Sequence, residues 1–475
     1  MMTGQKVTIH KFGGSCLRDK ESFAKTLSIM KKFMDTPSIA VLSAFRGITD
    51  KLIGVMELAL EDEMKALNKC KDLQLFHEDI AKKTIQDEAL VQDAISFSRD
   101  SFKLVATTVH EIFTGGLPRN MRDYVVSFGE RLSSYLFSCF LKAEGLNAQF
   151  FPGDALITTS SDFGSALPLM GETSGKVLRT VKPALDQGTI PIVAGFYGED
   201  INREITTLGR GGTDFTATIL ANVLSSVLDP VVMFWKDVDG LLTANPNIEE
   251  NAMLITQVSY DEAKELAYFG SKVLHPLCLS MTMEKNIPVE IRNFNKDLDA
   301  PFTQISGYMK ENIDVVKAIA CIEKCVMVTV QGAALVSLPG IAAKIFDLLA
   351  KHGVNILFIS QASSENNITF VVNEQGGPVA VKRLQESEFF GKTGDTHWID
   401  VFQEDVSLIA VVGHGMAKKY GISGQVFTAL GNAGVNVRAI AQGSSELNIS
   451  ILISPDDLKA AIHAIHEKFS LHQPK

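Results

Sequence analysis

The stretch KVTIHKFGGS (residues 6–15) decides the fold, together with SIAVLSA at residues 38–44. Each begins with the short apolar run of a buried strand, and the first ends in a lysine and two glycines. Between them, ESFAKTLSIMKKFM (21–34) has apolar residues at the spacing of a helix. Strand, glycine loop, helix and strand make a βαβ unit, which predicts a parallel sheet of the α/β class.

Further apolar runs predict more strands of this sheet, and each runs into a polar or glycine-containing turn: NAQFF (147–151), IPIVAGF (190–196) and PVVMFW (230–235). Residues 51–113 are rich in Glu, Lys, Leu and Ala, so we expect helices there that cover or flank the sheet. In open α/β sheets, ligands bind at the carboxyl ends of the strands. The glycines and charges that follow these strands therefore predict a binding site at that edge.

Composition and charge exclude several classes of protein. The chain has 475 residues and a net charge of −10 without a basic block, which argues against nucleic acid or an anionic membrane as a partner. It contains no apolar run of membrane-spanning length and no signal-peptide core. The six cysteines show no paired metal spacing. We therefore expect reduced thiols in a soluble cytoplasmic protein.

The most unusual loop is TTLGRGGTDFTA at residues 206–217. Its three glycines allow tight turns and close backbone approach, and Arg210 can grip a carboxylate or a phosphate with two hydrogen bonds. Thr213 or Asp214 is expected to cap the helix that follows, which would leave free N–H groups facing an anion. The alternative is a glycine-rich turn with no ligand.

Two other stretches place charge beside glycine. In KFGGS (11–15), Lys11 could neutralise a phosphate while the glycines let backbone amides approach its oxygens. In SFGERLSS (127–134), we expect a helix to begin near Glu130, which would either cap that helix or hold an ammonium group. Neither a P-loop nor a dinucleotide-binding glycine motif is present, which argues against P-loop and NAD chemistry.

Two later stretches are candidates for a nucleotide site. WKDVDGLLTANP (235–246) follows a strand and is either an acidic turn or a nucleotide-binding loop. ELAYFGSKVLHP (265–276) is expected to place Lys272 and His275 at the end of a helix, before a proline. A lysine there either complements the helix dipole or reaches a phosphate.

The C-terminal third contains an internal repeat. Residues 340–369 align with residues 421–450 without a gap, and 14 of the 30 positions are identical. Each copy reads as a glycine turn, an amphipathic helix, a strand, a turn and a strand. The chain therefore carries two copies of one small module, which either bind a ligand or only pack together.

Taken together, these stretches resemble the aspartate kinases of the amino acid kinase superfamily, and the repeat resembles their paired ACT regulatory domains. The resemblance implies an amino acid kinase sheet sandwiched by helices, followed by two α+β ferredoxin-like ACT domains. It implies a catalytic domain at 1–305 with a helical insert at about 51–113, a first ACT domain at 321–398, and a second made of 306–320 with 399–475. The motifs that carry it are KFGGS, SAFRGITD, FGERLSS, GFYG, TTLGRGGTD, WKDVDGLLTANP and ELAYFGSKVLHP.

The implied reaction moves the γ-phosphoryl group of MgATP to the β-carboxylate of L-aspartate, as the first step toward lysine, threonine and methionine. Because this carboxylate is already ionised at neutral pH, no general base is needed. The difficulty is that two anionic groups must approach, so catalysis should consist of positioning and cationic stabilisation.

The resemblance also assigns site residues. Lys11 would contact the transferring phosphoryl, Asp214 would orient Lys11, Arg210 would clamp the aspartate α-carboxylate and Glu130 would hold its ammonium. Mg²⁺ would be held by phosphates and water, without a protein ligand. Other substrate positions are Ser43, Ala44, Thr49, Phe196 and Thr213. The nucleotide positions, besides Lys11, are Gly13, Gly14, Ser15, Lys236, Asp237, Leu242, Asn247 and Lys272.

For regulation, the resemblance implies inhibition by an end-product amino acid. Leu357 stands where lysine-sensitive members have an aspartate, so a buried lysine ammonium would lack a counter-charge. Gln361 and Gln442 could bond a neutral hydroxyl, with Asn355 and Asn436 near the amino-acid backbone, which favours threonine over lysine. We expect a homodimer or a dimer of dimers through the ACT domains, and no fused dehydrogenase domain.

Two rival functions stay open. Glutamate and acetylglutamate kinases phosphorylate carboxylates on the same fold, although the helical insert, FGERLSS and the ACT pair argue against them. A catalytically silent amino-acid sensor would keep the fold, but Lys11, Glu130, Arg210 and Asp214 argue against it.

Overall fold

The structure is a computed structural model that describes residues 4–270, 273–307, 315–332, 340–361, 367–387, 389–390, 399–443 and 445–473. The chain forms two compact units. The first contains Met1–Leu241, Thr256–Tyr260 and Val273–Tyr308, and the second contains Leu242–Ile255, Asp261–Lys272 and Met309–Lys475. Two short stretches from the middle of the chain therefore pack with its C-terminal part.

The first unit is built on an eight-stranded sheet with the order β3-β5-β2-β1-β8-β10-β11-β9. Every neighbouring pair is parallel except β10 and β11. This confirms the predicted mostly parallel sheet. The strands are β1 (Lys6–Phe12), β2 (Ser38–Leu42), β3 (Ala148–Phe151), β5 (Ile190–Ala194), β8 (Asp229–Lys236), β9 (Gln257–Val258), β10 (Val289–Asn293) and β11 (Thr303–Ile305).

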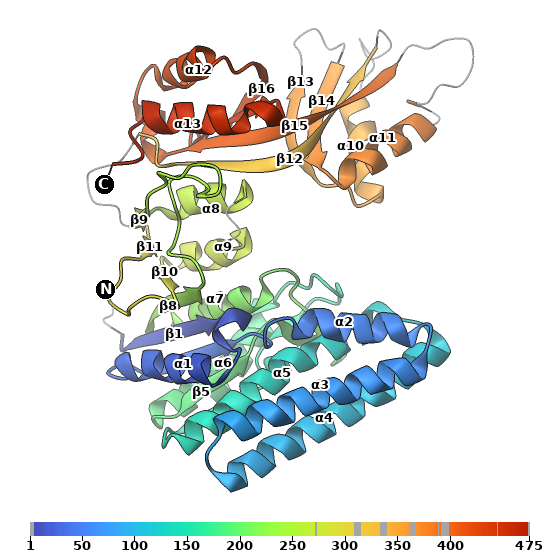
Figure 1. Cartoon of the computed structure of the whole chain (residues 1–475), viewed down its shortest axis with the longest axis vertical. Helices are drawn as coiled ribbons and strands as arrows, with labels where there is room; N and C mark the ends of the chain where they lie inside the picture. Colours follow the sequence, from blue (N-terminus) through green and yellow to red (C-terminus); the bar gives the residue numbers. More distant parts are fainter. Residues whose placement is uncertain are drawn as a thin grey trace. The chain divides into compact units, whose positions relative to one another are not determined.

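Helices flank the sheet, and the ones expected within residues 51–113 are present as α2, α3 and α4. Figure 1 shows α3 and α4 side by side, next to α2 and α5. Asp62 and Asp87 cap α3 and α4 by accepting a hydrogen bond from a backbone N–H of the first turn. The helices of this unit are α1 (Lys20–Lys32), α2 (Ile48–Ala59), α3 (Glu63–Thr84), α4 (Glu88–Gly115), α5 (Arg119–Ala143), α6 (Met170–Asp186), α7 (Gly212–Leu224) and α9 (Pro276–Glu284).

The carboxyl ends of three central strands meet at one edge of the sheet. Phe12, near the end of β1, is in register with Leu42 of β2 and Trp235 of β8. The residues that follow these strands are therefore neighbours. A small sheet of β4 (Thr158–Thr159), β6 (Tyr197–Asp200) and β7 (Ile205–Thr207) leads into the loop that precedes α7.

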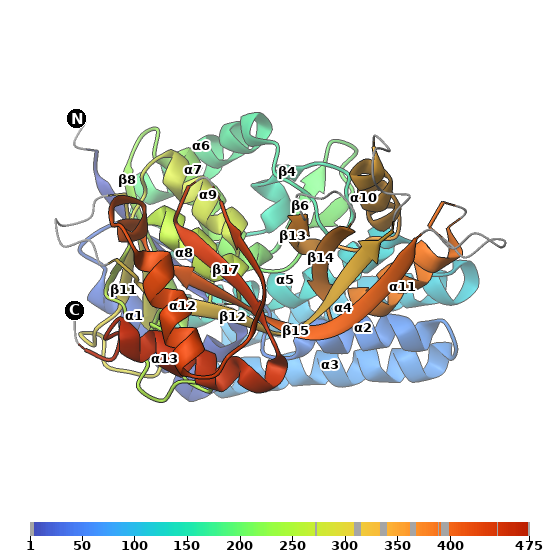
Figure 2. The ribbon, with the colours of Figure 1, turned by 90° about the horizontal axis from the view of Figure 1, so that it is seen from above.

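The second unit contains a six-stranded antiparallel sheet with the order β13-β14-β12-β15-β17-β16. Figure 2 shows its two long strands, β12 (Ala318–Gln331) and β15 (Asp400–Val412), side by side. The distal half of β12 pairs with β14 (Asn367–Asn373), whereas the distal half of β15 pairs with β17 (Asn448–Ile453). Each long strand therefore serves both halves of the sheet. The outer strands are β13 (Ile356–Gln361) and β16 (Val437–Gln442).

The two sequence repeats occupy equivalent places in this sheet. Gly340 and Gly421 precede their helices with φ of 86° and 78°, a left-handed conformation that favours glycine. Each helix leads into an outer strand, as the repeat predicts. The helices are α10 (Ile341–Lys351), α11 (Gly376–Glu386), α12 (Ile422–Asn432) and α13 (Leu458–Lys468), together with α8 (Tyr260–Tyr268), of which all but the first residue belongs to the second unit. Across the described ranges, no helix combines the length and apolarity needed to cross a membrane.

Candidate active site

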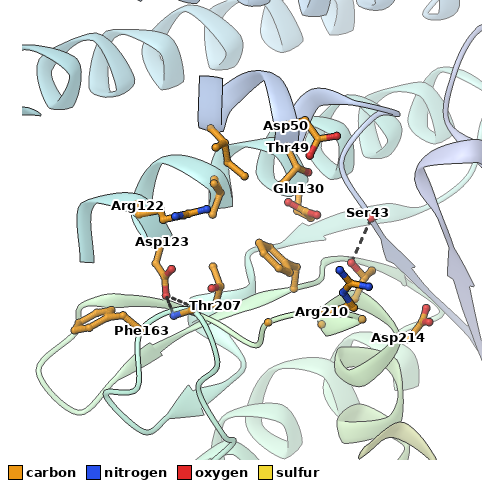
Figure 3. A pocket seen from close by; sticks show the side chains of 18 of the residues that line it. Ser43, Thr49, Asp50, Arg122, Asp123, Glu130, Phe163, Thr207, Arg210 and Asp214 are labelled. Atoms are coloured by element: carbon orange, nitrogen blue, oxygen red, sulfur yellow. Dashed lines mark hydrogen bonds between the residues drawn. The ribbon is translucent and has the colours of Figure 1, made fainter. Parts of the chain in front are cut away.

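A cavity of about 750 Å³ opens at the carboxyl edge of the large sheet. Its wall is formed by the ends of β1 and β2, the start of α2, one face of α5 and the loop before α7. Figure 3 shows Glu130, Arg210 and Asp214 around this cavity. Residues predicted from five separate stretches of sequence therefore line one space.

One wall of the cavity carries a paired cluster of charges. Asp214 lies in the first turn of α7 and forms two ion pairs. Its Oδ1 atom is 2.7 Å from Nζ of Lys11, and its Oδ2 atom is 2.7 Å from Nζ of Lys236. The Asp214 carboxyl is buried, which by itself would raise its pKa, but the two lysines outweigh burial and hold the pKa well below its usual range. Burial by itself would lower the pKa of Lys11, but the charge of Asp214 and its hydrogen bond raise the pKa above the usual value. The lysine therefore stays charged. The carboxylate thus fixes two cations at the strand ends.

The opposite wall holds a carboxyl group in a very different state. Glu130 is only 3% exposed, and its Oε2 atom is buried without a hydrogen-bond partner among the residues that the structure describes. Burial raises the pKa of Glu130 to about 8, although a backbone hydrogen bond at Ala44 and the charge of Lys11 pull it down. An unpaired buried carboxyl is costly, so this oxygen is suited to a cationic ligand group.

The position of Glu130 corrects the expectation that a helix begins beside it. Helix α5 begins at Arg119, after Pro118, so Glu130 lies in the middle of the helix. Gly129 marks close packing rather than a helix start, because a Cβ there would lie 2.8 Å from the Cβ of Ala44. Glu130 therefore cannot cap this helix. The geometry supports the other prediction, that Glu130 holds an ammonium group.

The glycine-rich loop holds Arg210 at the mouth of the cavity. Gly209 and Gly211 have φ of 73° and 76°, so only glycine fits these turns without strain. Arg210 is exposed and forms no ion pair with any residue in the described parts of the chain. The expected cap is wrong: α7 begins at Gly212 with Gly211 as its N-cap, and Thr213 and Asp214 lie inside the first turn.

The remaining predicted substrate residues lie close to this loop. The Ser43 and Thr213 hydroxyl oxygens are 3.3 Å apart, and Thr49 lines the same cavity (Figure 3). Ala44 is buried against Gly129. Phe196 lines the cavity with φ of 77°, an uncommon conformation for a residue with a side chain, and such strain often occurs at functional sites.

Asp123 is a cavity residue that the sequence motifs did not reveal. It is buried, and its Oδ2 atom accepts hydrogen bonds from the backbone N–H groups of Gly164 at 2.8 Å and Thr207 at 2.7 Å. It therefore ties α5 to the strand that leads into the Arg210 loop. Asp123 precedes Glu130 by two helical turns, so the spacing on one helix face could have identified it. Arg119, Arg122, Asp50 and Phe163 also line the cavity and were not predicted.

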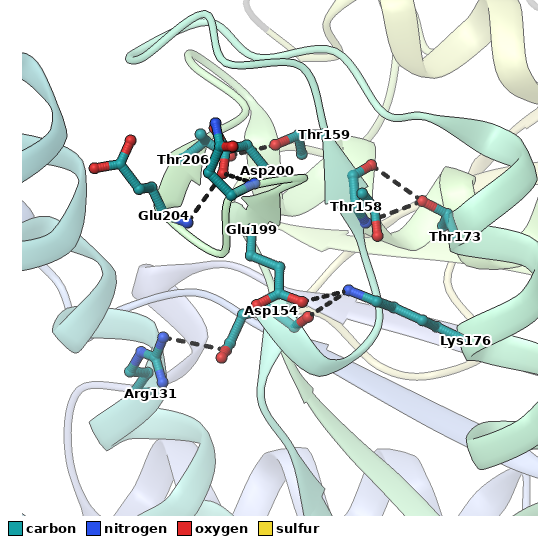
Figure 4. Close-up of polar contacts among 11 residues, drawn as sticks. Arg131, Asp154, Thr158, Thr159, Thr173, Lys176, Glu199, Asp200, Glu204 and Thr206 are labelled. Atoms are coloured by element: carbon teal, nitrogen blue, oxygen red, sulfur yellow. Dashed lines mark hydrogen bonds and ion pairs between the residues drawn. The ribbon is translucent and has the colours of Figure 1, made fainter.

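A polar network braces the helix next to Glu130. Figure 4 shows Arg131 paired with Asp154 at 3.1 Å and Lys176 paired with Glu199 at 2.7 Å. The Arg131 guanidinium also lies 4.6 Å from the centre of the Tyr197 ring, in a cation–π contact. These contacts fix the orientation of α5, and thereby the direction in which Glu130 points.

Comparison with known proteins decides the family. The amino acid kinase family model matches residues 6–293, which is more than half of the chain. The chain belongs to the amino acid kinase family. An ACT domain model also matches this amino acid kinase twice, at residues 328–387 and 409–469, so the predicted fold class is confirmed.

Among named relatives, this amino acid kinase resembles aspartokinases. It is 30% identical to bifunctional aspartokinase/homoserine dehydrogenase 2 of Arabidopsis thaliana over 98% of the chain, and it spans about half of that relative, 51%. It is 28% identical to aspartokinase 2 of the same plant, covering 98% of this chain and 85% of the relative. The predicted resemblance to aspartate kinases is confirmed.

Solved structures of E. coli aspartokinase III have the same fold. The complex of that enzyme with aspartate and ADP matches with a TM-score of 0.79 and 26% identity, covering 97% of this chain and 99% of that chain. Its complex with lysine and aspartate matches with a TM-score of 0.80 and 26% identity, covering 98% and 99%. The similarity therefore extends across both compact units.

The predicted nucleotide residues fall into three groups. Gly13, Gly14 and Ser15 follow β1, and Lys236 and Asp237 end or follow β8, all within the unit that holds the cavity. A Cβ on Gly14 would meet the Ala44 carbonyl oxygen at 2.9 Å, so this turn requires glycine.

Leu242 and Asn247 belong to the second unit. Lys272 lies outside the described residues, and His275 caps the start of α9 rather than following the end of a helix.

The predicted regulatory residues occupy equivalent positions in the two repeats. Asn355 precedes β13 and Gln361 ends it, whereas Asn436 precedes β16 and Gln442 ends it. All four side chains are exposed. The outer strands β13 and β16 also contact each other, so both pairs lie along one edge region of the second unit.

Proposed function

We propose that this amino acid kinase phosphorylates the β-carboxylate of L-aspartate with ATP and so forms 4-phospho-L-aspartate. The observation that carries the proposal is the division of charge across one cavity. Glu130 offers a buried oxygen and Arg210 a guanidinium, both unpaired among the residues that the structure describes, and they match the ammonium and α-carboxylate of an amino acid. E. coli aspartokinase III, which has the same fold, was solved with aspartate and ADP.

In this proposal, the acceptor carboxylate lies between its two anchors and the lysine cluster. Lys11 contacts the transferring phosphoryl and stabilises the negative charge that it carries in the transition state. Asp214 holds Lys11 and Lys236 in place and removes no proton, because the acceptor is already ionised. Ser43, Ala44, Thr49, Phe196 and Thr213 complete the acceptor pocket.

ATP supplies the phosphoryl group, and Gly13, Gly14, Ser15, Lys236 and Asp237 form the side of the site that faces its phosphates. Both Asp214 oxygens are already paired with lysine, so this carboxylate is not a good Mg²⁺ ligand. That suits a Mg²⁺ ion held by phosphate oxygens and water, which would neutralise the phosphates. The roles of Leu242, Asn247 and Lys272 on the nucleotide side remain part of the proposal.

The regulatory part of the proposal is feedback inhibition at the ACT modules, with threonine favoured over lysine. The side chain of Leu357 offers no counter-charge to a lysine ammonium, whereas the exposed Gln361 and Gln442 can bond a hydroxyl. Lysine is the alternative, because E. coli aspartokinase III was solved with it. The proposal includes the domain bounds: a catalytic domain at 1–305, a first ACT domain at 321–398 and a second made of 306–320 with 399–475. It also includes the reaction's place as the first step toward lysine, threonine and methionine.

We also propose that the chain assembles as a homodimer or a dimer of dimers through its ACT domains. Ile359 on β13 and Ile440 on β16 are 48% and 46% exposed, and they are equivalent residues of the two repeats. Exposed apolar residues on outer strands favour pairing with another sheet edge.

The test is an ADP-release assay with MgATP and L-aspartate, repeated with threonine and with lysine. We expect aspartate-dependent turnover that threonine suppresses. L-Glutamate and N-acetyl-L-glutamate test the rival kinases, and N-acetyl-L-aspartate tests the ammonium contact, because it should be a very poor acceptor. Inhibition by lysine alone would keep the kinase and overturn the regulatory part. Absence of turnover would favour the silent sensor.

A further inference from the structure

The last helix of the second unit places three metal-ligating side chains together, far along the chain from the cavity residues. His466 and Glu467 lie near the end of α13, and His472 lies in the turn that follows. One ligand atom from each lies within 4.8 Å of the other two. The Nδ1 atom of His472 is 3.1 Å from Oε1 of Glu467. Nothing in the catalytic proposal uses these residues.

The buried member of the cluster has a nitrogen with no hydrogen-bond partner in the described part of the chain. His466 is fully buried, and its Nε2 atom is hydrogen-bonded to Oγ1 of Thr243 at 3.0 Å. Its Nδ1 atom is also buried but has no hydrogen-bond partner. Because Nε2 is hydrogen-bonded to Thr243, Nδ1 is the ring nitrogen that is available to offer a lone pair to an ion. A His472–Glu467 ion pair alone would leave this nitrogen unexplained.

We propose that His466, Glu467 and His472 together bind one divalent transition-metal ion, with Zn²⁺ as the best match. Two imidazole nitrogens and one carboxylate oxygen suit Zn²⁺ better than Mg²⁺ or Ca²⁺, which prefer oxygen ligands. With Zn²⁺ bonds of about 2.0–2.1 Å, neighbouring ligand atoms of a tetrahedron are about 3.3 Å apart. The His472 Nδ1–Glu467 Oε1 pair, at 3.1 Å, is near this spacing, and all three ligand atoms lie within 4.8 Å of one another. A water molecule would complete the coordination.

The turn after α13 presents His472 to the other two ligands. Ser470 adopts φ of 52°, and Leu471 donates its backbone N–H to the His466 carbonyl at 3.0 Å. This closes the helix end as a Schellman-type turn. Leu471 is fully buried in the core of the unit. These contacts hold the chain against the end of α13. They therefore position His472 near the other two residues before any ion binds.

Thr243 supplies the support that a histidine ligand normally needs. With the ion on Nδ1, the His466 Nε2–H group donates to Thr243 Oγ1, which fixes the tautomer and the direction of the ring. Thr243 is itself held by backbone hydrogen bonds with Met253 at 2.9 Å and Ile319 at 2.8 Å. The ion would thus connect α13 to the 242–255 segment and to β12, all inside the second unit.

The experiment is a Co²⁺ titration of the full-length, untagged protein after chelator treatment. We expect about one equivalent of Co²⁺ to bind with the visible absorption of a low-coordinate Co²⁺–histidine site, Zn²⁺ to displace it, and Zn²⁺ to raise the thermal midpoint. His472→Ala should abolish the spectrum, and Glu467→Gln should weaken binding by at least roughly 10-fold. Both residues are partly exposed, so we expect the variants to fold.

His463→Ala is the matched control. His463 lies on the same helix and is exposed, but its Nδ1 atom pairs with Glu249 at 2.8 Å outside the cluster. This variant should bind Co²⁺ like the wild type. Absence of stoichiometric binding in the wild type, or equal loss in His463→Ala and His472→Ala, would overturn the proposal. Circular dichroism of each variant checks that a lost spectrum is not lost structure.

Discussion

The two walls of the cavity manage charge in opposite ways. On the wall assigned to the phosphoryl group, Lys11 and Lys236 are already paired with Asp214 before any ligand arrives. Two other groups are assigned to the acceptor. Glu130, on the wall across from these lysines, has a buried oxygen that is unpaired among the described residues, and Arg210, on the loop that leads to Asp214, has no ion pair among them. The lysine cluster is organised in advance, whereas the acceptor groups gain their partners from the ligand.

This difference separates the expected effects on catalysis and on binding. A cation held rigidly by Asp214 can stabilise developing charge without reorganising, which lowers the barrier and affects kcat. A group that gains its partner only from the bound amino acid contributes to affinity, and therefore mainly to KM. The following variants test whether the two walls really divide in this way.

Lys11→Ala should have the largest effect, because it removes the cation that we propose lies beside the transferring phosphoryl. We expect kcat to fall by roughly 10²–10³-fold or more, measured by ADP release at saturating substrates. The thermal midpoint, measured alongside, shows whether the fold survives with Asp214 paired to Lys236 alone. Turnover close to the wild-type rate in a folded variant would remove Lys11 from the mechanism.

Glu130→Gln should act on the acceptor instead. The amide has nearly the same shape but cannot form the charge-assisted bond to an ammonium, so we expect the aspartate KM to rise by roughly 10–100-fold. The ATP KM should hardly change. If the ATP KM rises as much as the aspartate KM, the two walls are not separate.

Arg210→Ala should raise the aspartate KM far more than the ATP KM, by about 10-fold. The effect is expected to be smaller than for Glu130, because Arg210 is exposed and its ion pair with the α-carboxylate is weakened by water. Initial rates with each substrate varied in turn provide the measurement. An effect confined to ATP would refute the carboxylate clamp.

The raised pKa of Glu130 predicts proton release when the amino acid binds. Because the pKa is about 8 in the free enzyme, the carboxyl is mostly protonated at pH 7 and must ionise to pair with an ammonium. Calorimetry of aspartate binding in buffers of different ionisation enthalpy should show close to one proton released at pH 7 and fewer above pH 9. The control Glu130→Gln should release none.

The raised pKa of Glu130 also predicts how the stability of the protein depends on pH. Its pKa is higher in the folded protein than the ordinary value of 4.5, so protons bind the folded state more tightly. The stability that this group adds is present below about pH 4.5 and is lost as the pH rises through 8. The thermal midpoint of Glu130→Gln should therefore fall less than that of the wild type between pH 6 and pH 9.

Gln442→Ala should have the smallest effect on the reaction itself. We expect inhibition by threonine to weaken by on the order of 10-fold, since one hydrogen bond to the effector is lost, with basal turnover unchanged. Gln361→Ala, at the equivalent position of the other repeat, shows whether the two copies contribute equally. Inhibition that is unchanged in the double variant would place the effector elsewhere.

The sequence was sufficient to predict the sheet and the strand ends that carry the site. Lys11 follows from reading where β1 stops, because parallel strands end at one edge, whereas Lys236 was predicted from the resemblance to the aspartate kinases. The helix boundaries were harder. Gly129 suggests a helix start in the sequence, yet it lies inside α5. Glycine is needed there because Ala44 packs directly against it. Such close contacts come from residues that are distant in sequence.

Other features depend on tertiary structure alone. Asp123 could have been found from its spacing to Glu130, but its bonds to Gly164 and Thr207 could not. The unpaired oxygen of Glu130 is a property of packing, since nothing in FGERLSS shows which polar groups surround it. In the same way, no motif indicates that residues 242–255 pack with the C-terminal unit.

The exchange of strands in the second unit has a consequence for how this part of the chain can be divided. Residues 318–322 of β12 pair with β15 beside β17, and residues 400–406 of β15 pair with β12 beside β14. A gene fragment that encoded one repeat alone would yield half a sheet with a missing strand. The two repeats therefore complete one shared sheet, so we expect them to unfold together even though the sequence contains two copies.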